Sequence, residues 1–165
     1  MKDLRSDRSV GSDRSDGFKR LRPSGGYRRL RSFRVATIIY DATVSFCERF
    51  LDKRSRTVDQ MTQAARSGRQ NIAEGSRASA ASSQTELRLV VVARSSLDDL
   101  LLYYEDFLRQ RKQRLWDKAD PEAQEVRERY KGMTDQSDQT DQSDFALYAK
   151  WLNHTNPAIV ANALI

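Results

Sequence analysis

The chain has 165 residues, of which 38% are hydrophobic and 32% charged, and its net charge at pH 7 is +6. A chain of this length can bury the core of one domain without disulfides or a bound metal. It has a single cysteine, Cys47, which rules out an internal disulfide. There is also no apolar run of about 18 residues and no signal-peptide pattern, which argues against a membrane-spanning or secreted protein. We therefore expect a cytoplasmic protein.

Residues 1–31 form a basic segment that is poor in apolar side chains. They hold ten Lys and Arg against four Asp, and they repeat the triplet Arg-Ser-Asp at Arg5 and Arg14. Such a composition cannot bury enough apolar surface to fold alone. We expect a disordered basic arm over 1–31 and one folded domain over 32–165.

Two amphipathic helices are predicted next. Residues 32–52 place apolar side chains at three- and four-residue steps, behind Ser32 as a predicted N-cap. Residues 53–56 form a short polar connection, and a second helix reaches about residue 75. Small residues dominate the inner face of this second helix, so a neighbouring helix can approach it closely. That face consists of Met61, Ala64, Ala65, Gly68, Ile72 and Gly75.

The third predicted helix is the longest and carries two separate apolar stripes. It starts at the capping-box pattern Ser83-Gln84-Thr85-Glu86 and runs to Leu115 or Lys118. The first stripe comprises Leu87, Val90, Val91, Leu97, Leu101, Tyr104 and Leu108. The second comprises Leu89, Val92, Leu100, Tyr103 and Phe107.

A helix in a monomeric bundle needs only one apolar face, so the second stripe is predicted to be a self-association interface. The alternative is that residues 121–130 or the last helix cover it within the chain. Arg94 lies in the first stripe, where an unpaired cation is costly. We expect it to be paired in the interior with Asp98, with Asn71 and Glu74 as further candidate partners.

The next segment, from about 119 to 144, is predicted to be irregular or partly helical. Residues 121–130 suit a short helix, and the Asp/Gln repeat at 135–144 suits a solvated loop. An apolar pattern resumes at 145–152, and Asn156-Pro157 is typical of the start of a last helix. These elements predict an all-α protein, an antiparallel up-and-down four-helix bundle with a polar loop before its last helix.

No catalytic constellation is evident. His154 is the only histidine and Cys47 the only cysteine, so one chain cannot supply a His/Cys metal site. Adjacent carboxylates such as Asp98 and Asp99 point to different faces of a helix. There is no phosphate-binding glycine loop. We expect a non-enzymatic protein with no metal and no cofactor.

Basic residues on the second helix and before it form a candidate nucleic-acid surface. They are Lys53, Arg54, Arg56, Arg66, Arg69 and Arg77. The arm over 1–31 could add phosphate contacts, and Tyr27 and Phe33 offer stacking surface. Arginine-rich helix faces are also common as plain solvated surface, so both interpretations stay open.

The stretch Gln63 to Gly75 contains Asn71-Ile72-Ala73-Glu74-Gly75, and Ala93-Arg94-Ser95-Ser96-Leu97 follows on the next helix. These two motifs resemble the four-helix-bundle family of proteins encoded in intervening sequences of bacterial ribosomal RNA. The same family holds the accessory variability determinants of diversity-generating retroelements, including the four-helix-bundle suffix-domain branch. In this chain Gly68-Arg69-Gln70 departs from the family pattern, since relatives often carry Ile-Pro there.

This resemblance covers about residues 27–165. It implies a pentameric ring and no known reaction, and for the retroelement branch it implies binding to nucleic acid and to a reverse transcriptase. We therefore expect a homo-oligomeric scaffold or protein-interaction module. The alternative is a basic nucleic-acid-binding accessory protein that partners a reverse transcriptase.

Overall fold

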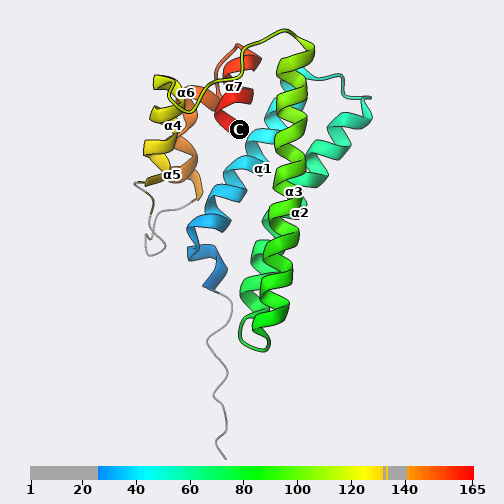
Figure 1. Ribbon diagram of the computed structural model, residues 1–165, viewed down its shortest axis with the longest axis vertical. Coiled ribbons are helices and arrows are strands. Elements are labelled where there is room, and N and C mark those ends of the chain that lie inside the picture. Colours follow the sequence, from blue (N-terminus) through cyan, green and yellow to red (C-terminus); the bar gives the residue numbers. More distant parts are fainter. Residues whose placement is uncertain (1–25, 132, 134–140) are drawn as a thin grey trace, which may run out of the picture.

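The computed structural model describes residues 26–131, 133 and 141–165, and within these ranges it is all-helical (Figure 1). Three long α-helices come first, preceded by a 3-10 helix, η1, at Gly26–Arg29. They are α1 (Arg31–Phe50), α2 (Arg56–Ala78) and α3 (Ser83–Gln110). Four shorter helices follow: α4 (Pro121–Lys131), α5 (Asp141–Ala146), α6 (Ala149–Leu152) and α7 (Pro157–Leu164).

Two of the three long helices start after a serine whose side chain accepts a hydrogen bond from an N–H group of the first turn. The Ser55 side chain accepts a hydrogen bond from Thr57 N at the start of α2. Ser82, one residue before the predicted cap, accepts from Thr85 N at the start of α3. The N-cap predicted at Ser32 is wrong, because α1 begins at Arg31 behind Leu30, which makes no side-chain cap.

Helices α2 and α3 form the largest helix–helix contact, and small residues allow it. A Cβ added at Gly68 would lie 2.7 Å from the Cγ and Cδ2 atoms of Leu97 on α3. One added at Gly75 would lie 3.5 Å from the Cβ of Leu89. The expected close approach at the inner face of the second helix is therefore confirmed.

No single fourth long helix is present among the described residues. Helix α3 ends at Gln110, earlier than predicted, and Lys112 then takes a positive φ of 55°, which a helix cannot continue. Figure 1 shows α4 to α7 gathered beside α1 and the C-terminal end of α3. Short helices thus replace the last helix of the predicted bundle, and they leave the N-terminal half of α3 packed mainly on α2.

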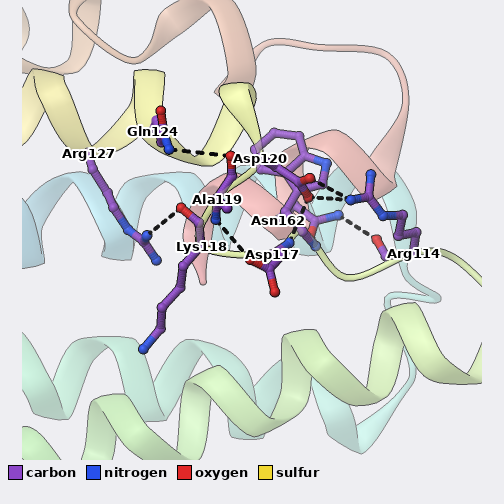
Figure 2. Close-up of polar contacts among 9 residues, drawn as sticks. Arg114, Asp117, Lys118, Ala119, Asp120, Gln124, Arg127 and Asn162 are labelled. Atoms are coloured by element: carbon purple, nitrogen blue, oxygen red, sulfur yellow. Dashed lines mark hydrogen bonds and ion pairs between the residues drawn. The ribbon is translucent and has the colours of Figure 1, made fainter.

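A polar network holds the segment between α3 and α4 in place (Figure 2). Asp120 accepts from Arg114 Nη2 at 2.6 Å and from Asp117 N at 2.7 Å. The hydrogen bond from Arg114 lowers the pKa of Asp120. Asn162 on α7 accepts from Trp116 N at 2.7 Å and donates to the Arg114 carbonyl at 3.0 Å. The network is structural, since each of these groups supports the backbone of the connection or of α7.

The core is centred on aromatic rings from α1 and α3. Phe46 meets Tyr104 and Phe107 edge to face, with ring centroids 5.2 and 4.9 Å apart. The Tyr104 hydroxyl is 2.9 Å from Thr43 Oγ1, so its polar end is satisfied. A second cluster joins Ile38 of α1 to the aromatic residues near α6.

The end of the Asp/Gln repeat does not match its predicted solvated loop. Residues 134–140 lie outside the described part of the chain, but α5 begins at Asp141, and the Asp144 side chain is fully buried. Both carboxylate oxygens of Asp144 accept from the buried guanidinium of Arg34. The prediction of a solvated loop rested on composition alone. The buried Arg34 guanidinium on α1 compensates the charge of Asp144, so this carboxylate can be buried.

The end of the predicted disordered arm is also ordered. Residues 1–25 lie outside the described part, but Gly26–Arg29 form η1, and Tyr27 is buried. The Tyr27 ring packs edge to face on Phe33 at 4.8 Å. Both aromatic side chains predicted as stacking surface are therefore used within the fold.

Candidate interaction surface

The N-terminal half of α3 exposes a run of large apolar side chains. Val91 is 58% exposed and Leu87 63%. At about 100° per residue, they share a face about 120° wide with Val90 and Leu102. We call this the α3 face and define it as Leu87, Val90, Val91, Arg94, Asp98, Leu101 and Leu102.

The α3 face comes mostly from the stripe that was expected to be internal. The stripe predicted as the self-association interface lies mostly inside the chain instead. Leu100 and Phe107 are buried in the core cluster with Phe46, and Leu89 is half-buried against α2. Tyr103 is half-buried, and only Val92 is exposed. The second stripe faces the interior of the fold. Leu100 and Phe107 are therefore buried and cannot contact a second copy.

An apolar groove of about 570 Å³ borders the α3 face. Leu30 at the start of α1 forms one wall, Ile72 of α2 contributes from the middle, and Val90 and Leu97 of α3 form the other wall. The last helix of an up-and-down bundle would pack between its first and third helices, which is where this groove lies. The groove and the α3 face together mark the side on which the described part of the chain places no long helix.

Arg94 and Asp98 lie in the middle of the α3 face. Their side chains are 84% and 68% exposed, with 3.7 Å between Arg94 Nε and Asp98 Oδ2. The predicted partner is therefore present, but the predicted interior position is wrong, because no long helix of the described ranges covers this part of α3.

The motif residues on α2 hold the two central helices together. Asn71 Nδ2 donates to the Ser67 carbonyl at 2.9 Å and to Ser67 Oγ at 3.2 Å. Ser67 Oγ in turn lies 3.0 Å from Ser96 Oγ on α3. Glu74 accepts from Gln70 on its own helix at 3.1 Å, so neither Asn71 nor Glu74 is positioned as the partner of Arg94. The Asn-Ile-Ala-Glu-Gly motif is thus explained by packing of α2 on α3, with Gly75 buried at its end.

The predicted nucleic-acid residues divide into two groups. Arg69 lies over the Tyr40 ring at 4.5 Å, and Arg77 donates to the Tyr27 hydroxyl at 3.0 Å. Both guanidinium groups therefore help to fix α1 and η1 on α2. The other four, Lys53, Arg54, Arg56 and Arg66, are exposed. The stretch from Arg56 to Arg77 extends over about 30 Å of helix, so the six residues do not form one compact patch.

The described residues contain no group of three His, Cys, Asp or Glu side chains placed to hold a metal. The single thiol lies in the core, and burial raises the pKa of Cys47, which disfavours its nucleophilic thiolate form. His154 Nδ1 accepts from Asn156 N at 2.9 Å in the turn before α7. Among the helices of the described ranges, none combines the length and apolarity needed to span a bilayer.

No protein-family model, curated protein or solved structure matches the chain. The resemblance to the bundle family therefore depends on the motifs at 71–75 and 93–97 and stays a prediction.

Proposed function

We propose that this protein is a non-enzymatic helical scaffold that self-associates through the α3 face. The observation that supports this most is the cluster formed by Leu87, Val90 and Val91, which are all exposed on one side of one helix. Contiguous apolar patches of this kind are rare on monomeric proteins and are typical of protein–protein interfaces.

The adjoining groove strengthens the proposal. It carries mostly apolar lining at a position where the described residues place no long helix, so a helix from another copy would complete a four-helix arrangement there. The pentamer implied by the family resemblance is one possible assembly of this kind.

The test of the proposed function is the solution mass of the full chain over a range of protein concentrations. Light scattering after size exclusion should give a multiple of the chain mass of 19.0 kDa. A mass of one chain at every concentration up to the millimolar range would overturn the proposal.

A second candidate function is weak, sequence-independent nucleic-acid binding, with a reverse transcriptase as a further partner. Its support is that Lys53, Arg54 and Arg56 are exposed together at the α1–α2 connection. Among the described residues, none of the three forms a salt bridge, so their charges are available to phosphates.

A salt titration tests this second function. Anisotropy of labelled duplex and single-stranded DNA should show binding that weakens as salt rises, because phosphate contacts release counterions. Replacing Lys53, Arg54 and Arg56 with Gln should flatten the salt dependence. Undetectable binding even at low ionic strength would remove this candidate, and co-purification with a co-expressed retroelement reverse transcriptase tests that partner separately.

A further inference from the structure

Six residues of α3 follow one another at steps of four, three, four, three and four: Leu87, Val91, Arg94, Asp98, Leu101 and Glu105. Alternating steps of three and four place side chains along one seam of a helix, as in a coiled coil. The series of steps also reads the same in both directions, with its midpoint at the level of Ser96. A seam with this symmetry can pair with an antiparallel copy of itself.

An antiparallel pair about that midpoint brings opposite charges together at its centre. Arg94 of one copy faces Asp98 of the second copy, and the reverse pair forms at the same time, as an isologous interface requires. Val91 then faces Leu101 of the second copy. Leu87 of one copy lies level with Glu105 of the second copy at each end of the seam, and Val90 and Leu102 flank the seam on opposite sides.

A parallel pair in register gives the opposite result. It would place Arg94 against Arg94 of the second copy and Asp98 against Asp98. Like charges placed together at an interface disfavour that arrangement. The charge order on the seam therefore selects the antiparallel arrangement.

The two charged side chains are available for this exchange. They are 84% and 68% exposed, and their own contact of 3.7 Å is at the long end for an ion pair. Within the described residues, neither forms a second salt bridge. We infer that two copies of this chain pair through antiparallel α3 helices about a twofold axis at the level of Ser96, with Arg94 of each copy bound to Asp98 of the other. This inference rests on the proposed function, because it specifies how the α3 face self-associates.

Charge reversal tests the pairing. The variant Arg94→Asp carries aspartate at both 94 and 98, so its antiparallel pair brings only negative charges together. The variant Asp98→Arg carries arginine at both positions, so its pair brings only positive charges together. Each variant alone should raise the dimer Kd about tenfold or more, measured by analytical ultracentrifugation. The double variant Arg94→Asp/Asp98→Arg should regain the affinity of the unchanged protein.

The single variants test the orientation, and an equal mixture of the two tests whether these charges lie at the interface. Neither variant can form its own i, i+4 ion pair, but across the proposed interface every contact in the mixed dimer joins opposite charges. Native mass spectrometry should show a dimer with one copy of each variant, in excess over both homodimers. Because both side chains are exposed, the melting temperatures of the single variants should match that of the unchanged protein at concentrations where all are monomeric, which excludes misfolding as the cause.

Two failures can be told apart. An unchanged protein that stays monomeric removes both the proposed function and this inference. If the protein self-associates but the charge variants pair as tightly as it does, or the mixture gives no excess of mixed dimer, the α3 face keeps its proposed function and the antiparallel pairing is wrong. A five-membered ring would likewise contradict the twofold axis, since a ring of five requires a head-to-tail interface.

Discussion

Arg34 near the start of α1 and Asp144 in α5, 110 residues apart in sequence, form a fully buried, bidentate ion pair. It connects the first helix of the fold to the set of short helices that replaces the fourth. Two charges removed from water stabilise a protein only while both are present, because either one alone is buried without compensation.

Breaking this pair should therefore be costly. Asp144→Asn should lower the free energy of unfolding by about 3–5 kcal/mol, measured by urea titration. The double variant Arg34→Met/Asp144→Leu should recover much of that loss, because no buried charge remains. The matched control is Lys150→Gln, which removes the exposed pair with Glu125 and should cost less than about 1 kcal/mol. Equal losses for Asp144→Asn and Lys150→Gln would show that the buried pair is not important.

Two glycines of α2 should respond in opposite directions to the same substitution. In Gly68→Ala the new methyl lies 2.7 Å from the Leu97 side chain, so Leu97 or the two helices must shift, and the loss should reach about 2 kcal/mol after the gain in helix propensity. In Gly75→Ala the nearest atoms are 3.5 Å away, an ordinary contact. That variant should gain about 1 kcal/mol from helix propensity. Thermal unfolding of both variants tests the two predictions. Stabilisation by Gly68→Ala would contradict the close packing of α2 on α3.

Burial of the Tyr104 hydroxyl predicts a loss of stability at alkaline pH. Desolvation raises the pKa of Tyr104 in the folded state above its ordinary value of about 10. As the pH rises, the unfolded state therefore releases the Tyr104 proton first. The contribution of Tyr104 to the free energy of unfolding is complete below pH 10 and is lost as the pH rises above it.

The measurement is the free energy of unfolding between pH 8 and 11 for the unchanged protein and Tyr104→Phe. The variant should start about 1 kcal/mol lower, because the hydrogen bond to Thr43 is lost, and the difference should shrink as the pH rises. Cys47 is present in both proteins, so the effect of its own burial on its pKa contributes to both. A constant difference over this range would show that the Tyr104 hydroxyl is not desolvated.

Local sequence patterns located most of the helices. The step pattern of α1, the polar connection before α2 and the Asn156-Pro157 start of α7 depend on neighbours within one helical turn. Their positions agree with the structure to within a few residues. The Asn156 side chain caps Ala158 N as predicted. The end of α3 was misplaced because the residues after Gln110, Arg-Lys-Gln-Arg-Leu, are good helix formers, while a positive φ at Lys112 ends the helix.

The errors at Arg94, Asp144 and the second stripe of α3 share one cause. Periodicity shows that α3 has two apolar faces, but which face is covered depends on where distant segments pack. The same holds for Asp144, which reads as part of a polar repeat until Arg34 is placed beside it. Asn162, which ties α7 to the segment before α4, gives no signal in the sequence beyond its position in an apolar helix.

Two adjacent valines on α3 allow the most direct test of the central claim. Val91 belongs to the α3 face and Val92 to the stripe first expected to self-associate, and their side chains are 58% and 47% exposed. Glu at either position adds the same charge at a similar exposure, so the two variants should be equally soluble and equally stable. They differ in the side of α3 that they alter.

The measurement is the solution mass of Val91→Glu, Val92→Glu and the unchanged protein, taken by light scattering at matched concentrations. We expect the unchanged protein and Val92→Glu to share one oligomeric mass, while Val91→Glu falls to the mass of a single chain. An oligomer that survives Val91→Glu, or one that only Val92→Glu disrupts, would contradict self-association through the α3 face.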